Sequence, residues 1–330
     1  MNWINPLFKK DNKKIVDFIF IFLIHILIFI LFFDVINFGH TLYGSDFILQ
    51  FLPWKKFIYD SIREYGSIPF WNPYLFSGIP FISNIQASIF YPLGFLYYLI
   101  PPETAYLFST MLHFSLGGIF TYIFIRSISI GCLGAFISSI IFIFNGFFIG
   151  HLYAGHLTFI QTYIWIPLIL LFLKKYFNTL FLGYAIFSGI VLGIQILGGF
   201  PQLVFYTVLT IFAYFIFNLF YEIRKRSYKI IITYGIGIIV ILCIGFGISA
   251  IQVLPTLEFL SHSTRAGGVS YEFATYDSLH PKEMIEFLIP DIFGSVIDNT
   301  YWLYEEKWHS WETCAYTGII PLFLIIFGVK

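Results

Sequence analysis

Eight apolar runs constrain this chain more than any other feature of its sequence. In a helix, about 20 mostly apolar residues cross about 30 Å of hydrocarbon, and each run approaches or reaches that length. A segment in lipid must also satisfy its own backbone hydrogen bonds, which favours helices. The sequence therefore predicts an all-α integral membrane protein whose eight transmembrane helices cover approximately residues 15–37, 104–125, 131–149, 157–173, 179–198, 202–221, 230–253 and 315–329.

Composition supports a membrane protein and argues against nucleic-acid binding. Of the 330 residues, 58% are hydrophobic and 11% are charged, whereas a soluble domain carries about 25% charged residues. The 18 basic and 18 acidic residues balance to a net charge of zero, so no basic surface for nucleic acid is expected. The lipid bilayer is the partner that this composition predicts.

The distribution of charge predicts how the chain is oriented, because loops rich in Lys and Arg stay in the cytoplasm. With the N-terminus inside, only Asp11, Asp17 and Glu222 among the acidic residues lie on or near the inner side. We therefore predict a multi-pass protein of the cytoplasmic membrane with an active side that faces outward. Twelve of the 18 basic residues then lie in short inner segments: Lys9, Lys10, Lys13, Lys14, Arg126, Lys174, Lys175, Arg224, Lys225, Arg226, Lys229 and Lys330.

Two long loops, residues 38–103 and 254–314, fall on the outer side of this single membrane domain, which covers residues 1–330. Their aromatic residues predict packed structure with interfacial helices rather than disordered linkers. Within the first loop, Ala87–Ile100 is apolar but is shorter than a span and contains Pro92. As a ninth crossing it would export the basic cluster at 224–229, so we predict a re-entrant or interfacial helix there.

Asp46 is the first candidate for chemistry, because it follows the first helix and lies between apolar residues at the membrane surface. A carboxylate in that setting is costly to desolvate, and desolvation suits it to act as a general base for an acceptor hydroxyl. The alternative is a helix N-cap, since Ser45 and Asp46 precede a short interfacial helix in the predicted loop.

Two further groups of polar residues lie in the outer loops. The first group is Trp71, Asn72, Asn84 and Gln86, which stand among Pro and Gly residues. The Asn and Gln amides would either bind sugar hydroxyls or satisfy the loop's own backbone. In the last loop, the fork of Arg265 suits a phosphate, or equally an ion pair with Glu258 or Glu272.

Metal and nucleotide chemistry receive little support from the sequence. His151 and His156 are five residues apart, which is poor metal-ligand spacing, so we interpret them as interfacial polar residues and predict no metal site. The sequence contains no Walker loop, no G-x-S-x-G elbow and no HExxH motif. This argues against an ATP-driven transporter and against a serine or zinc hydrolase.

Several short motifs along the whole chain resemble the YfhO family of bacterial multispanning membrane proteins. In the first loop they are Gly44-Ser45-Asp46 with Gln50 and Pro53-Trp54, Trp71-Asn72-Pro73, Gly78-Ile79-Pro80, Asn84, Gln86 and Tyr91-Pro92. Further along they are Gly199-Phe200-Pro201-Gln202, Leu254-Pro255-Thr256-Leu257-Glu258, Arg265-Ala266-Gly267-Gly268 and the stretch from Tyr316-Thr317-Gly318 to Pro321.

The resemblance implies a GT-C-like glycosyltransferase, which takes a sugar from a polyprenyl-phosphate carrier and adds it to an extracytoplasmic envelope acceptor such as a teichoic-acid-type polymer or glycan. It places the essential acidic residue at Asp46, although Ser45 stands where the family's pattern has Gly directly before the Asp. It further implies that the chain is the N-terminal part of a longer protein. No metal dependence follows from the residues. The donor phosphate is expected at Arg265 and Lys282, and a substrate platform at Gln50, Trp54, Trp71, Asn72, Asn84, Gln86 and Glu258.

A different class of function is a non-catalytic carrier for a lipid-linked sugar, or an envelope-assembly protein. Such a carrier requires polar residues along a route through the helices. The predicted spans offer little beyond His113, Gln161 and Gln195. This scarcity favours a site at the membrane surface.

Overall fold

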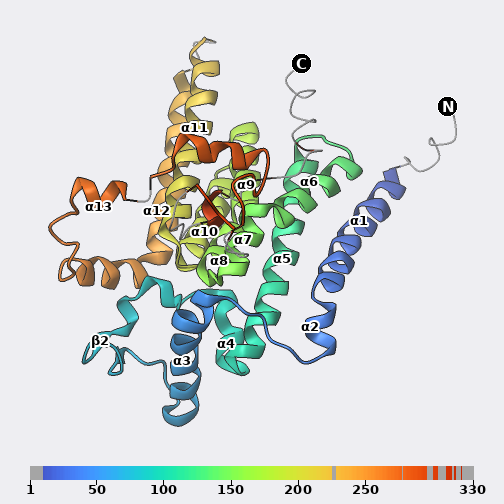
Figure 1. Ribbon diagram of the computed structural model, residues 1–330. Helices are drawn as coiled ribbons and strands as arrows, with labels where there is room; N and C mark the ends of the chain where they lie inside the picture. The colour runs from blue at the N-terminus through green and yellow to red at the C-terminus, as the bar shows by residue number, and fades with distance from the viewer. Residues whose placement is uncertain are drawn as a thin grey trace.

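The computed structural model describes residues 10–224, 228–276, 278–295, 300–303, 310–313, 316 and 321. The protein is about 75% helical, and its long helices form a bundle from which two extended loop regions project (Figure 1). Among these described residues, six helical segments are long and apolar enough to cross a membrane, and a seventh, α10 (Leu182–Leu197), is apolar but shorter. An all-α membrane protein is thus confirmed, while the predicted span 315–329 lies outside the described residues except for Tyr316 and Pro321.

The observed helices extend most of the predicted spans at one or both ends. Their bounds are α1 Lys10–Leu31, α2 Phe33–Asn37, α5 Pro102–Ser127, α6 Cys132–Phe144, α7 Gly146–Ala154, α8 Leu157–Tyr163, α9 Ile166–Thr179, α11 Pro201–Arg224 and α12 Tyr228–Leu260. The predicted span 131–149 is two helices, because Asn145 has an extended backbone and its side chain accepts a hydrogen bond from the Phe148 N–H at 2.8 Å. This N-cap starts α7 as a separate helix, which runs on to Ala154.

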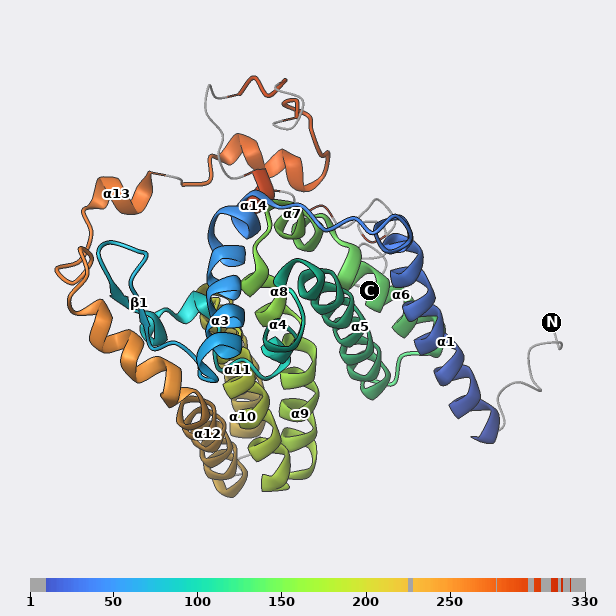
Figure 2. The same ribbon diagram turned by 90° about the horizontal axis from the view of Figure 1, so that it is seen from below.

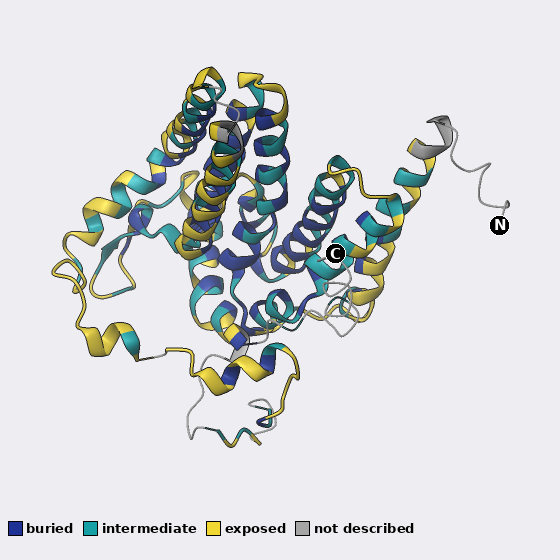
Figure 3. Ribbon diagram, turned by 90° about the horizontal axis from the view of Figure 1, so that it is seen from above, coloured by how far each residue is buried: buried dark blue, intermediate teal, exposed yellow. Residues whose placement is uncertain are grey.

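Close packing of small residues joins α10 to α12. A Cβ on Gly193 would lie 3.1 Å from the Gly245 carbonyl oxygen, and one on Gly189 would lie 2.9 Å from the Ile241 carbonyl oxygen. Helices in lipid gain little from hydrophobic burial against each other and rely on such close approach. Figure 3 shows the buried residues gathered in the middle of the bundle, whereas α1, at one edge, is mostly exposed.

Basic and acidic side chains meet at one end of the bundle, where α1 begins and α5 ends. Arg126 Nε lies 2.8 Å from Asp17 Oδ1, and the Tyr122 hydroxyl donates to the same oxygen at 2.6 Å. Lys174 on α9 donates to the carbonyl of Ser127, the residue that follows Arg126. These contacts fix the ends of α1, α5 and α9 relative to one another.

The first loop folds into short elements at the opposite end, seen from below in Figure 2. They are the π-helix η2 Phe47–Phe51, α3 Leu52–Tyr65, the antiparallel pair β1 Trp71–Asn72 and β2 Ile79–Pro80, the 3-10 turns η3 Phe81–Ser83, η4 Ile85–Ala87 and η5 Pro92–Phe95, and α4 Leu96–Leu99. No crossing helix forms over residues 87–100; η5 and α4 make one short helical segment, Pro92–Leu99, within the stretch where an interfacial or re-entrant helix is predicted. Tyr91 anchors this part, since its buried hydroxyl receives the Trp165 indole N–H at 3.0 Å and lies 2.8 Å from His113 Nε2.

The last loop continues from α12 through the described elements α13 Tyr271–Thr275, η6 Pro281–Phe287 and α14 Ser310–Thr313. Its start is attached to the first loop, because Gln252 donates to the Ile82 carbonyl at 2.8 Å and Thr256 donates to the Ser83 carbonyl at 2.9 Å. The turn at Gly199 reaches the same place, where an added Cβ would lie 2.5 Å from the Ile85 carbonyl oxygen. The loops at this end therefore form one connected surface.

Candidate functional site

Asp46 lies in the first turn of a helical stretch that continues through η2 into α3. Its backbone is already helical, with φ −69° and ψ −33°, and its side chain caps no backbone N–H. The N-cap interpretation of Asp46 therefore does not hold. The π-helix that follows is wider than an α-helix, a deviation that is frequent at functional sites.

The Asp46 carboxylate is paired with a histidine from a distant part of the chain. His156 Nε2 lies 3.0 Å from Asp46 Oδ2, and His156 Nδ1 lies 2.6 Å from His151 Nδ1. The Asp46 side chain is 46% exposed, whereas that of His156 is 14% exposed. The carboxylate is thus about half exposed, whereas the histidine that contacts it is largely buried.

Two glycines bring these residues together. A Cβ on Gly44 would lie 2.4 Å from the Gly155 Cα, and a Cβ on Gly155 would lie 2.6 Å from the Phe47 backbone nitrogen. Gly155 also has φ +86°, a left-handed conformation that L side chains rarely adopt. Both positions therefore require glycine, and their contact places Asp46 directly beside His156.

Hydrogen-bonding chemistry assigns the roles in this cluster. A carboxylate has no hydrogen to donate, so the His156 Nε2–H is the donor to Asp46. The contact between the two Nδ1 atoms requires a hydrogen on one of them, so both ring nitrogens of His156 are engaged. His156 consequently orients Asp46, and the free carboxylate oxygen is the group available to a substrate.

His151 is buried, and its ring centroid lies 3.7 Å from that of Phe159 and 4.6 Å from that of Phe147. The structure thus packs His151 against aromatic rings and pairs it with His156, which the interpretation as interfacial polar residues did not include. The sequence did not reveal their place beside Asp46, because they lie 105 and 110 residues from it in the chain. Among the described residues, no group of three His, Cys, Asp or Glu side chains is placed to hold a metal ion.

Part of the expected substrate platform lies near Asp46 along the helix. Gln50 is one turn after Asp46, and its amide donates to the Gln86 side-chain oxygen at 2.9 Å. Trp54 is half-buried among apolar side chains, with its ring 5.8 Å from that of Phe51. Gln50 therefore belongs to the same helical segment as the carboxylate, and its hydrogen bond joins that segment to η4.

Other members of that platform support the loop's own backbone. The Asn72 side-chain oxygen accepts from the Tyr74 N–H at 2.9 Å, and that of Asn84 accepts from the Gln86 N–H at 3.1 Å. The ring of Trp71 covers Gly78, where an added Cβ would lie 2.6 Å from it. These contacts agree with the second alternative from the sequence, in which the Asn and Gln amides satisfy the loop's own backbone.

Lys55 is a buried cation in the first loop that sequence reasoning did not single out. Its side chain is 1% exposed, and its ammonium donates to the Ala87 carbonyl at 2.7 Å and to the Ser88 hydroxyl at 2.9 Å. Desolvation by burial lowers the pKa of Lys55 from 10.5 to about 7. The signal that could have found it is its place inside an apolar helical face, with Phe51 and Ile58 about one turn away on either side.

The residues expected to bind the donor phosphate are exposed and lie apart from Asp46. Glu258 is on the last turns of α12, Arg265 follows that helix, and Lys282 is in the first turn of η6. The Arg265 guanidinium lies 5.5 Å from the centre of the Phe273 ring. In the part of the chain that the structure describes, Arg265 pairs with neither Glu258 nor Glu272, and no hydrogen bond or ion pair links these residues to Asp46.

Comparisons of the chain with models of known protein families, with curated proteins and with solved structures found no match. The resemblance to the YfhO family therefore stays a prediction from the sequence motifs. The candidate site is therefore defined by the arrangement of residues around Asp46.

Proposed function

We propose that this protein is a GT-C-type membrane glycosyltransferase of the YfhO family. It transfers a sugar from a polyprenyl-phosphate-linked donor to an extracytoplasmic envelope acceptor, such as a teichoic-acid-type polymer or glycan. The observation that carries the proposal is the half-exposed carboxylate of Asp46, held by His156 at the loop end of an apolar helix bundle. A lipid-linked donor and a polymeric acceptor would meet at such a surface.

In the proposed reaction, Asp46 acts as the general base. It takes the proton of the acceptor hydroxyl while that oxygen forms a bond to the anomeric carbon of the sugar. The bond from that carbon to the phosphate oxygen breaks, and the lipid phosphate leaves with the electron pair. The sugar is thereby transferred with inversion, and the charge on the departing phosphate needs a cation nearby.

Arg265 and Lys282 are the proposed cations for that phosphate. Both are exposed on the loop that follows α12, and α12 is hydrogen-bonded to the first loop through Gln252 and Thr256. A guanidinium and an ammonium suit phosphate, because both carry several hydrogen-bond donors and a positive charge. In this proposal, the last loop approaches Asp46 when the donor binds.

The membrane arrangement belongs to the same proposal. We infer a cytoplasmic N-terminus, an eighth crossing at 315–329 and loops that face outward from a bacterial cytoplasmic membrane. The supporting observations are the concentration of Lys and Arg on the predicted inner side and the joining of the loops at the other end of the bundle.

Two of the three polar residues that the spans offer to a route, Gln195 and His113, favour the enzyme over a carrier. The Gln195 amide donates to the Thr162 carbonyl at 3.2 Å and to the Thr207 hydroxyl at 2.9 Å. His113 lies 2.8 Å from the Tyr91 hydroxyl. These contacts connect neighbouring helices and loops, as expected of groups that hold a bundle together rather than line a route through it.

The experiment is transfer of radiolabelled sugar from polyprenyl-phosphate donors to envelope polymers, in membranes that contain the wild type or Asp46→Asn at equal levels. Asp46→Asn removes the base and is expected to abolish transfer without loss of membrane insertion. Asp60→Asn is the matched control, since Asp60 is exposed on α3, and it should leave transfer unchanged. Wild-type activity in Asp46→Asn would refute the role of this carboxylate.

A further inference from the structure

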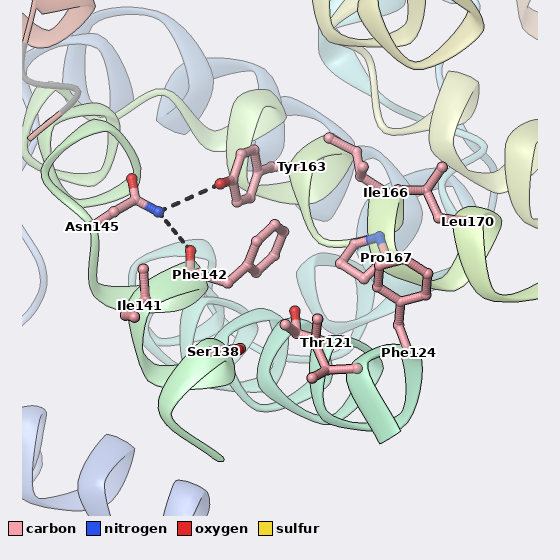
Figure 4. A pocket seen from close by; sticks show the side chains of 11 residues that line it. Thr121, Phe124, Ser138, Ile141, Phe142, Asn145, Tyr163, Ile166, Pro167 and Leu170 are labelled. Carbon is pink, nitrogen blue, oxygen red and sulfur yellow. Dashed lines mark hydrogen bonds between the residues drawn. The ribbon is translucent and has the colours of Figure 1, made fainter. Parts of the chain in front are cut away.

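A cavity of about 450 Å³ lies within the membrane-crossing part of the bundle. Its walls come from α5, α6 and the α8–α9 segment, and Figure 4 shows the lining side chains around it. Phe124 and Ile125 line it from α5, Ile141 and Phe142 from α6, and Leu170 from α9. All three walls belong to helical segments that are long and apolar enough to span a bilayer.

The polar side chains on the cavity wall offer little to a polar solute. Thr121 donates to the Gly117 carbonyl at 2.8 Å, and Ser138 donates to the Gly134 carbonyl at 2.8 Å. The Asn145 amide donates to the Phe142 carbonyl at 2.7 Å. The amide also donates to the hydroxyl of Tyr163, the other polar side chain of the lining, at 3.4 Å. Because the polar groups of the wall are thus hydrogen-bonded within the protein, the cavity presents a mainly hydrocarbon surface, which fits a hydrocarbon chain.

Basic side chains lie just beyond one end of this cavity. Lys174 is one helical turn after Leu170, and it donates to the Ser127 carbonyl of α5. The Lys175 ammonium lies 5.4 Å from the centre of the Tyr184 ring. In the described part of the chain, neither lysine is paired with a carboxylate, whereas Arg126 on the facing helix is matched by Asp17. Two cations without a carboxylate partner in the described chain therefore follow Leu170 at the end of the α9 wall: Lys174 faces α5, and Lys175 faces Tyr184 of α10.

We propose that this is a binding site for an anionic phospholipid. One acyl chain occupies the cavity between α5, α6 and α9, and the phosphate group lies against Lys174 and Lys175 in the leaflet at the basic end of the bundle. Basic pockets between transmembrane helices bind anionic head groups in this way, and the apolar lining selects the chain. The site is separate from Asp46, which lies at the opposite end, and it does not depend on the proposed glycosyl transfer.

Native mass spectrometry of the full chain, released from nanodiscs that contain equal amounts of phosphatidylglycerol and phosphatidylcholine, tests the proposal. We expect one retained phosphatidylglycerol in preference to phosphatidylcholine. Lys174→Gln should lower its retention about fivefold, the factor that corresponds to the loss of about 1 kcal/mol per basic side chain. Lys229→Gln is the matched control, since Lys229 is exposed on α12, and it should retain the lipid.

A second pair of variants tests the cavity. Leu170→Trp fills the space and should prevent lipid retention, whereas Leu209→Trp, at an exposed site on α11, should not. Ser138→Phe fills the space from the α6 wall, and it replaces Leu170→Trp in the test if Leu170→Trp lowers the melting temperature. Equal retention of both lipids, or retention unaffected by the cavity-filling variants, would overturn the proposal.

Discussion

Replacing Lys55 by Met tests whether a buried cation makes stability depend on pH. In the folded protein, burial lowers the pKa of Lys55 from 10.5 to about 7. This difference corresponds to about 5 kcal/mol, because one pKa unit is about 1.4 kcal/mol. Below pH 7 both the folded and the unfolded chain hold the proton, so the folded protein bears this whole penalty.

The sign of the dependence follows from proton counting. Between about pH 7 and 10.5 the unfolded chain binds the Lys55 proton and the folded chain does not, so the stability of the wild type rises with pH. The rise is about 1.4 kcal/mol per pH unit, or about 3 kcal/mol between pH 7 and pH 9.5. Lys55→Met removes this contribution and also leaves the Ala87 carbonyl and the Ser88 hydroxyl without their donor. Lys55→Met should therefore be less stable than the wild type at pH 9.5, and the difference in unfolding free energy should be much smaller at pH 6.5.

The assay is reversible unfolding by SDS in mixed micelles, followed by circular dichroism at pH 6.5, 8 and 9.5. Lys56→Met is the matched control, because Lys56 is the exposed neighbour on α3, and it should keep the wild-type pH dependence. The reasoning is refuted if wild type and Lys55→Met show the same change in unfolding free energy between pH 6.5 and 9.5.

Two further predictions concern the Asp46 cluster. His156→Asn removes the donor that orients Asp46, and it should lower sugar transfer by about 100-fold, as expected for a misplaced catalytic group. The control His262→Asn, at an exposed residue beyond α12, should keep wild-type transfer. Equal activity in the two variants would contradict the positioning role of His156. Gly155→Ala places a Cβ 2.6 Å from the Phe47 nitrogen at φ +86°, and it should cost about 1–3 kcal/mol of stability. Gly267→Ala, where an added Cβ meets nothing within 4 Å, is its control in thermal unfolding, and equal melting temperatures would show that the Gly44–Gly155 contact tolerates a side chain.

The helices were predictable because hydrophobicity over about 20 residues is a local signal. The predicted span 104–125 became α5, Pro102–Ser127, and 230–253 became part of α12, Tyr228–Leu260. The break at Asn145 was missed, since a single capping amide decides it within a run that is apolar on both sides. Helix ends depend on such individual hydrogen bonds more than on composition.

The site was harder to predict than the helices. Asp46 was identified from its place after the first helix, but its partner His156 depends on the approach of two glycines that are distant in sequence. Lys55 was missed for a similar reason, because its two acceptors at Ala87 and Ser88 come from a turn that the sequence pattern did not reveal. Contacts of this kind arise from tertiary packing, which local periodicity does not encode.

The π-helix after Asp46 sets the rotational register of the candidate base. Five residues, Phe47–Phe51, separate the Asp46 turn from the regular helix α3, whose position is fixed by Lys55 and its neighbours. An α-helix advances about 100° per residue, so removing one residue from this wide turn would rotate Asp46 about a quarter of the way around the helix axis. The carboxylate would then point away from His156 while every side chain of α3 kept its place. The one extra residue in this turn is therefore what aims Asp46 at its partner.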